Sequence, residues 1–259
     1  MFACVNCGTD YAKRRDECRG CGLFGSIVAA KRDGRRRAVC VADLAAKEIE
    51  RVQSGHAAWD LVVGGGTAVG SVIVVAGVAG VGKTTIVCHV AAACARAMGG
   101  RALVLSAEMS ADGIAATARR ARADLGALFV IETRELTAAS AAVETEAPRV
   151  VVLDSIQRIG VPGLGEDAAQ KATVREAMRW AQSAKRIVIL VSQLTKEGAV
   201  AGPQGTIHDV DTIVWVRKKE LRVPSKNRFG PTPVKASLVR EKEARGQASI
   251  DASASPNEP

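Results

Sequence analysis

The chain has 259 residues, of which 47% are apolar, so it is long enough to bury a sizeable hydrophobic core. Its formal charge of +9 favours a polyanionic partner, nucleic acid above all, although an anionic membrane would suit a basic surface equally well. With only three Trp, one Tyr and four Phe, contact with single-stranded nucleic acid would depend on backbone charge more than on base stacking.

Four cysteines near the amino end follow the spacing of a zinc-binding ribbon. They read C-x2-C-x10-C-x2-C and are Cys4, Cys7, Cys18 and Cys21. Two such pairs can place four thiolates around one tetrahedral Zn²⁺, which would be structural because no position is left for a substrate. A set of disulfide or redox pairs is the alternative. We therefore assign residues 1–27 to a zinc ribbon.

The opening residues, MFACVNCGTD, lack the basic and apolar regions of a secretory signal, so a reducing, cytoplasmic location is expected. Residues 28–55 contain the basic stretch KRDGRRR and are interpreted as a solvated linker, with contact to DNA phosphates as the alternative. The uncharged run 61–82 has the length of a membrane span, but it is rich in glycine and ends in a phosphate-loop pattern. No membrane partner is expected.

A phosphate-binding loop follows the first predicted strand of the core. Residues 71–76, SVIVVA, are typical of a buried parallel strand, and GVAGVGKTT follows directly. The pattern G-x-x-x-x-G-K-[ST] predicts that loop amides surround nucleotide phosphates, that Lys83 bridges phosphate oxygens and that the Thr84 hydroxyl binds Mg²⁺. The predicted ATP contacts in this loop are Gly77, Gly80, Gly82, Lys83, Thr84 and Thr85. The apolar residues 86–98 supply the helix that the loop requires.

Further apolar runs predict parallel strands separated by Ala-rich helices. These runs are residues 101–108, 128–133, 149–154 and 186–193. The alternation predicts an α/β fold with a mainly parallel central sheet that is covered on both faces. In such sheets chemistry collects at the carboxyl ends of the strands, so the polar residues that close the runs are informative.

Three of these closing residues are candidates for the ATP site. Asp154 is expected to hold Mg²⁺ through water, Glu108 to orient and deprotonate the attacking water, and Gln193 to sense the γ-phosphate. Each has a simpler alternative. Asp154 would be a strand-end cap, Glu108 a surface carboxylate and Gln193 a turn residue.

Together these motifs resemble the bacterial RadA (Sms) family of RecA-like ATPases. The resemblance is carried by the four-cysteine ribbon, the phosphate loop, GGGTAVGS (64–71), LDSIQ (153–157), TKEGAVAGP (195–203) and KNRFG (226–230). It implies a hexameric ring that hydrolyses ATP and moves on single-stranded or branched DNA in recombination and repair. It also implies that Lys196 and Arg158 face DNA and that Glu108 is the catalytic carboxylate.

KNRFG lies between two candidate strands of a hairpin, LRVPS and TPVKASLV. We expect the turn to present Lys226 and Arg228, as catalytic cations, to the γ-phosphate or the DNA at the boundary with a neighbouring subunit. In the alternative, Phe229 packs under the hairpin and the cations are solvated.

The sequence also departs from the RadA pattern. Family members usually carry a long carboxyl-terminal domain that resembles the Lon protease, whereas this chain finishes shortly after VREKEARG. Residues 56–245 are interpreted as the RecA-like core and residues 246–259 as a disordered tail. SAEMS replaces the usual SGEES, and SQLTKEG replaces GHVTKEG. An ATP-binding adaptor that recruits a recombinase or replicative helicase is the main alternative function, and a KaiC-like kinase is a weaker one.

Overall fold

The computed structural model describes residues 2–4, 9–19, 26–29, 48–194, 208–218 and 220–238. Several sequence predictions fall outside these ranges. They are the zinc ligands Cys7 and Cys21, the basic stretch 31–37 of the predicted linker, the predicted DNA-contact residue Lys196 with its TKEGAVAGP stretch, and the tail 246–259.

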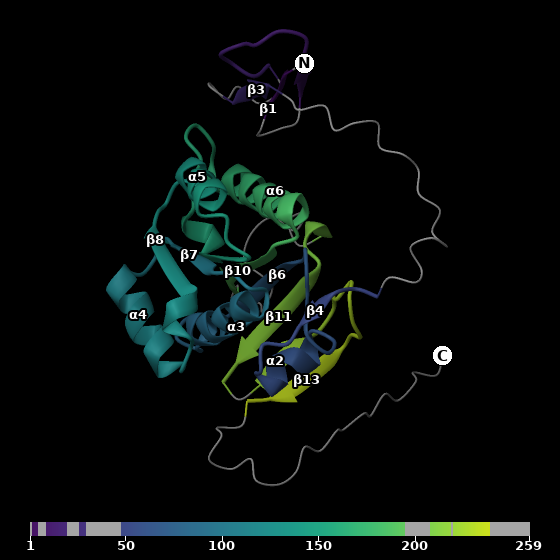
Figure 1. Ribbon diagram of the computed structural model, residues 1–259. Helices are drawn as coiled ribbons and strands as arrows, with labels where there is room; N and C mark the ends of the chain where they lie inside the picture. Colours follow the sequence, from purple (N-terminus) through teal and green to yellow (C-terminus); the bar gives the residue numbers. More distant parts are fainter. Residues whose placement is uncertain are drawn as a thin grey trace, which may run out of the picture.

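An eight-stranded sheet runs through the centre of the core (Figure 1), with the strand order β13-β12-β11-β6-β10-β9-β7-β8. The strands are β6 (Val72–Gly77), β7 (Ala102–Ser106), β8 (Leu128–Glu132), β9 (Val150–Asp154), β10 (Ile187–Gln193), β11 (Thr212–Arg217), β12 (Glu220–Val223) and β13 (Val234–Ser237). Strands β6 to β11 pair in parallel, and β12 and β13 extend the sheet as an antiparallel hairpin. The predicted mainly parallel sheet is confirmed.

Helices cover both faces of this sheet. They are α2 (Ala57–Val62), α3 (Lys83–Ala97), α4 (Ala111–Arg120), α5 (Leu136–Glu146) and α6 (Glu166–Ala184), with short 3-10 turns η1 (Leu125–Ala127) and η2 (Ile156–Arg158). Alternate residues of each strand enter opposite hydrophobic clusters, because successive side chains of a strand point to opposite faces. Ile73 and Val75 pack with α2, α3 and α4, whereas Val72 and Val74 pack with α5 and α6. This double burial explains why the strands read as continuous apolar runs.

Two small sheets lie outside the central one. β1 (Phe2–Cys4), β2 (Asp10–Tyr11) and β3 (Ile27–Ala29) form an antiparallel sheet near the amino end, and β4 (Arg51–Val52) pairs with β5 (Thr67–Ala68). Within the ranges that the structure describes, no helix has both the length and the apolar character that a membrane span requires.

Candidate functional site

The phosphate loop connects the end of β6 to the start of α3. The loop approaches β11 closely at Gly77, where an added Cβ would lie 2.7 Å from the Val216 carbonyl oxygen, so only glycine fits. Gly82 caps the amino end of α3 with a φ of +100°, a conformation that glycine adopts without steric cost. The amino end of this 15-residue helix therefore faces the loop, in the arrangement that favours an anion.

Lys83 holds its ammonium inside the loop. Its Nζ donates hydrogen bonds to the carbonyl oxygens of Gly77, at 2.8 Å, and Val78, at 3.0 Å. Burial lowers the pKa of Lys83, and the negative charges of Asp154 and Glu108 oppose that shift. The ammonium is thus surrounded by acceptors that a phosphate oxygen can replace, as expected of the lysine in this pattern.

A hydroxyl and a carboxylate meet beside this lysine. Thr84, in the first turn of α3, donates a hydrogen bond from Oγ1 to Asp154 Oδ2 at 2.7 Å, although the two residues are 70 positions apart. Burial raises the pKa of Asp154, with Glu108 adding to the shift, whereas the Thr84 hydrogen bond and Lys83 oppose it. Hard oxygen ligands on two elements suit Mg²⁺, which is bound through few protein groups and retains several waters. The pair therefore fits the predicted metal position.

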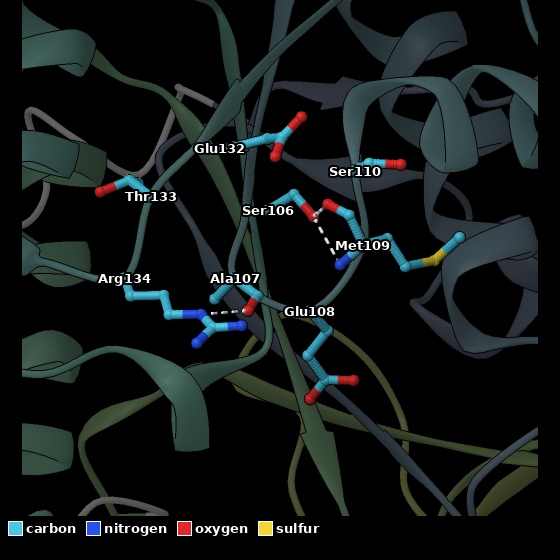
Figure 2. A pocket seen from close by; sticks show the side chains of 8 residues that line it. All are labelled: Ser106, Ala107, Glu108, Met109, Ser110, Glu132, Thr133 and Arg134. Carbon is cyan, nitrogen blue, oxygen red and sulfur yellow. Dashed lines mark hydrogen bonds between the residues drawn. The ribbon is translucent and has the colours of Figure 1, made fainter.

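Glu108 lies at the carboxyl end of β7, close to the end of β9. Ser155 Oγ donates a hydrogen bond to the Glu108 carboxylate, and the Ala107 N–H donates to the Asp154 carbonyl at 2.7 Å. Glu108 also borders a cavity of about 380 Å³ at the ends of β7 and β8 (Figure 2). Its lining is Ser106, Ala107, Glu108, Met109, Ser110, Glu132, Thr133 and Arg134. Arg134 Nε donates to the Ala107 carbonyl at 3.2 Å and so holds the turn that carries Glu108.

Two more predicted residues lie at the same edge of the sheet. Gln193 ends β10 in register with Gly77, so it adjoins the start of the phosphate loop. Arg158 ends η2, four positions after Asp154, and is exposed. The sheet therefore brings Lys83, Thr84, Glu108, Asp154 and Gln193 to one edge, although they come from four separate stretches of sequence.

The predicted hairpin is present, and its turn contacts the chain's own core. Lys226 Nζ donates a hydrogen bond to the His208 carbonyl at 2.6 Å. Arg228 donates to the same carbonyl, at 3.1 Å, and forms an ion pair with Asp211 Oδ1 at 3.0 Å. The contact of either cation with a neighbouring subunit stays a prediction.

No motif in the sequence assigns chemistry to Asp211, yet this buried carboxylate joins two distant segments of the chain. It accepts hydrogen bonds from Arg228 and, at 2.8 Å, from the backbone N–H of Val72, the first residue of β6. Val72 precedes Asp211 by 139 positions, so no local pattern could have indicated this connection.

Two of the four predicted zinc ligands share a small core. Cys4 and Cys18 are buried with Tyr11 and Ile27. Cys4 Sγ lies 3.2 Å from Ser26 Oγ, and Cys18 Sγ lies 3.0 Å from the Tyr11 hydroxyl. Across the described part of the chain no cluster of three metal-binding side chains occurs, and zinc stays a prediction.

Comparison with known proteins identifies the family. Residues 38–199 match the family described as the AAA domain. The DNA repair protein RadA of Pseudomonas aeruginosa is 33% identical over 253 residues, which cover 89% of this chain and 55% of that protein. The RadA proteins of Campylobacter jejuni and Listeria monocytogenes are both 29% identical, and their matches cover 90% and 89% of this chain and 57% and 55% of those proteins.

The chain thus spans about half the length of the curated relatives it matches. Its phosphate loop and the contact of Thr84 with Asp154 at the edge of the sheet are of the kind found in P-loop ATPases. The chain belongs to the AAA domain family and is a RadA-like P-loop ATPase of the RecA type.

Proposed function

We propose that this ATPase hydrolyses ATP in response to single-stranded or branched DNA, and that hydrolysis drives strand or branch movement during repair and recombination. The observation that carries the proposal is the contact of Thr84 Oγ1 with Asp154 beside Glu108, at the carboxyl edge of the sheet. The net charge of +9 supports a polyanionic partner, and the relatives are named DNA repair proteins.

Each residue of the edge has a role in this reaction. Thr84 and Asp154 hold Mg²⁺, which when bound neutralises charge on the phosphate oxygens. Lys83 leaves the carbonyl oxygens of Gly77 and Val78 to donate to phosphate oxygens. Glu108 accepts a proton from the attacking water, and the Ser155 hydroxyl keeps its carboxylate oriented. Gln193 senses the γ-phosphate.

Assembly completes the site in this proposal. Chains form a hexameric ring in which Lys226 and Arg228 of one subunit approach the nucleotide or DNA at the boundary with the next. Lys196 and Arg158 contact DNA phosphates, and the four-cysteine ribbon holds a structural Zn²⁺. A cation supplied across an interface can raise the rate of phosphoryl transfer about 10³-fold or more.

One observation favours a second function. Lys226 donates to the His208 carbonyl of its own chain, and Arg228 donates to the same carbonyl and to Asp211. These internal contacts fit an ATP-binding adaptor that recruits a recombinase or helicase without translocating. An adaptor needs nucleotide binding and assembly, but it does not need DNA to accelerate turnover.

Steady-state ATP turnover, measured at several protein concentrations with and without single-stranded DNA, separates these functions. Lys83→Ala serves as the inactive blank. A motor shows turnover per chain that rises with protein concentration and with DNA, and Lys226→Ala lowers it about 10³-fold while nucleotide still binds. Nucleotide binding without any stimulation by DNA supports the adaptor, and an unchanged rate for Lys226→Ala removes the role of the hairpin.

A further inference from the structure

A second cavity lies beside the KNRFG turn and shares no lining residue with the cavity at Glu108. Its volume is about 390 Å³, and it is lined by Arg175 and Met178 of α6 together with Asp209 and Arg228. Two guanidinium groups from parts of the chain 53 positions apart therefore border one hollow.

The position of the Arg228 side chain is fixed by a buried carboxylate. Its ion-pair partner Asp211 is only 6% exposed and is itself fixed by the backbone N–H of Val72. A guanidinium group has five N–H donors, and the hydrogen bonds to Asp211 and His208 use two of them. The remaining N–H donors of Arg228 are therefore already fixed in position, so the side chain loses little conformational entropy when a ligand binds.

Arg175 reaches the cavity from α6. The side of α6 that carries Glu176 and Trp180 contacts α5 and the core, whereas Arg175 is exposed and lies one turn before Met178. Within the described ranges Arg175 makes no hydrogen bond or ion pair with another residue. Its guanidinium is therefore available to a ligand.

The charges around the cavity favour an anion. Among the described residues here, Arg175, Arg228 and the neighbouring Lys226 are cationic, and the carboxylates of Asp209 and Asp211 oppose them. Burial lowers the pKa of Lys226, and the adjacent charge of Arg228 lowers it further. A bound anion would relieve this crowding of cations.

We infer that Arg175 and Arg228 form a phosphate-binding site beside the KNRFG turn. The planar fork of a guanidinium group matches the oxygens of a phosphate, and two such groups around one cavity can bind a phosphate from two sides. The phosphate comes either from single-stranded DNA or from the nucleotide of a neighbouring subunit. This source rests on the proposed function, whereas the binding itself does not depend on hydrolysis.

The first experiment measures the binding of inorganic tripolyphosphate by calorimetry in the Lys83→Ala background, where the phosphate loop is weakened. Adding Arg175→Gln should lower the affinity about tenfold, because a charge-assisted pair of hydrogen bonds is lost, and Arg175→Lys should give an intermediate value. Lys171→Gln removes the same charge from an exposed position one turn earlier on α6 and should have little effect.

The second experiment measures the binding of a fluorescent oligothymidylate at several salt concentrations in the presence of a non-hydrolysable ATP analogue. If DNA supplies the phosphate, Arg175→Gln weakens binding and reduces the salt slope by about 1, whereas Lys171→Gln does not. If only tripolyphosphate binding falls, the neighbour's nucleotide supplies the phosphate.

Equal affinities of Arg175→Gln and Lys171→Gln for both ligands would overturn the inference. A chain whose turnover ignores DNA would contradict the proposed function instead. The binding differences between the variants would still be measurable, so the two failures can be told apart.

Discussion

Asp154 illustrates how a residue of the ATP site can lower the stability of the nucleotide-free protein. Its carboxylate is buried at the end of β9 and lies near a second carboxylate, Glu108, so its charged form is disfavoured and its pKa is raised. One hydrogen bond from Thr84 and the charge of Lys83 compensate only in part. A site prepared to hold a cation therefore costs stability when the cation is absent, as is common at functional sites.

Replacing Asp154 with Asn should stabilise the nucleotide-free protein and abolish Mg²⁺-dependent ATP turnover. An acid whose pKa is raised on folding contributes stability below its unfolded pKa of 3.8 and loses that contribution as the pH rises through the folded value. The melting temperature of Asp154→Asn should therefore exceed that of the wild type at pH 7, and the difference should shrink toward pH 4. Thermal unfolding at both pH values measures it.

Asp124→Asn is the matched control for this charge change. Asp124 is exposed, and hydrogen bonding to Arg96 lowers its pKa, so the same substitution should not stabilise the chain at pH 7. A lower melting temperature for Asp154→Asn than for the wild type at pH 7 would mean that the Thr84 contact outweighs the burial of the charge.

At the scale of elements, the KNRFG turn is packed against the GGG stretch that precedes β5. Arg51, in β4, donates hydrogen bonds to the carbonyl oxygens of Val63, Gly66 and Phe229. A Cβ added to Gly230 would lie 2.6 Å from Asn227 Nδ2, 3.0 Å from Gly64 Cα and 3.2 Å from the Val63 carbonyl oxygen. Two of the motifs that carry the family resemblance are therefore in direct contact.

Gly230→Ala should displace the turn, because the Asn227 side chain and the backbone of Val63 and Gly64 leave no space for a methyl group. We expect a loss of about 1–3 kcal/mol in the free energy of unfolding, the usual cost of overpacking. ATP turnover should fall further than ATP affinity, since the cations of the turn move while the phosphate loop does not. Gly160→Ala is the control, because its nearest contact, at 3.6 Å, is of ordinary length. Equal stabilities of the two variants would show that the turn can relax.

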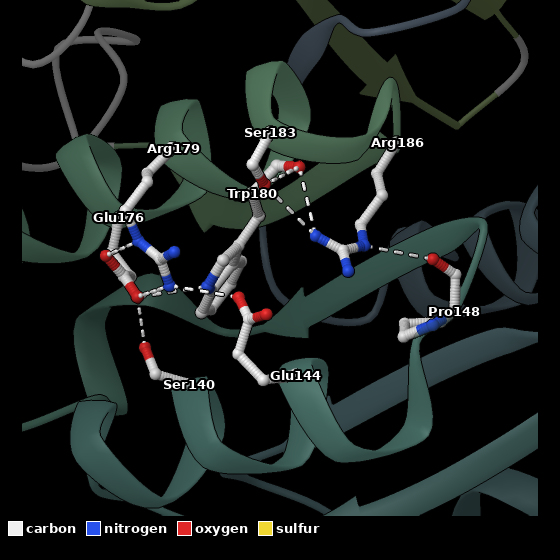
Figure 3. Close-up of polar contacts among 8 residues, drawn as sticks. All are labelled: Ser140, Glu144, Pro148, Glu176, Arg179, Trp180, Ser183 and Arg186. Carbon is white, nitrogen blue, oxygen red and sulfur yellow. Dashed lines mark hydrogen bonds and ion pairs between the residues drawn. The ribbon is translucent and has the colours of Figure 1, made fainter. Parts of the chain in front are cut away.

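Helices α5 and α6 are joined by a polar network (Figure 3). Glu176 accepts hydrogen bonds from Ser140, from Arg179 and, at 3.0 Å, from Trp180 Nε1, and Arg179 also pairs with Glu144. Burial alone would raise the pKa of Glu176, but the hydrogen bonds from Arg179 and Ser140 outweigh it and hold the pKa below its ordinary value. The buried carboxylate is thus well satisfied and fixes α6, the helix that carries Arg175.

Glu176→Gln should lower the free energy of unfolding by about 1–3 kcal/mol at pH 7, because buried donors lose a charged acceptor. An acid with a lowered folded pKa contributes stability above its unfolded pKa of 4.5, and this is lost as the pH falls through the folded value. Urea titrations at pH 7 and pH 4 should therefore give a smaller difference at pH 4. Glu144 is more exposed, so Glu144→Gln should cost less than about 1 kcal/mol. Equal losses of unfolding free energy in Glu176→Gln and Glu144→Gln would show that the effect comes from surface charge and not from the buried hydrogen bonds.

At the scale of the whole molecule, features that depend on a short stretch of sequence could be predicted. Contacts between segments far apart in the chain could not. The parallel strands were predictable because burial on both faces requires continuous apolar runs, and the phosphate loop because its spacing follows from its geometry. The hydrogen bond between Val72 and Asp211 depends on the pairing of strands across 139 residues. The contact of Gly64 with Gly230 depends on how the hairpin packs against the core. Neither leaves a periodic signal in the sequence.

The described chain contains hydrophobic clusters that share no residue. Cys4, Tyr11, Cys18 and Ile27 form one beneath the amino-terminal sheet, and the two clusters of the core lie on the faces of the central sheet. All three Trp residues of the chain, Trp59, Trp180 and Trp215, pack in or against the core clusters. Tryptophan fluorescence therefore reports on the core alone.

Removing the predicted Zn²⁺ with a chelator should unfold the amino-terminal sheet and leave the ATPase core folded. So few apolar residues cannot hold that sheet together without a metal, whereas the core buries two large clusters of its own. We expect about one zinc released per chain, an unchanged melting temperature by tryptophan fluorescence and unchanged ATP affinity. Cys4→Ser should lose the metal, and Cys40→Ser, outside the predicted ligand set, should keep it. A core transition that shifts with chelation would show that the two parts fold together, and a purified chain without zinc would remove the ribbon assignment.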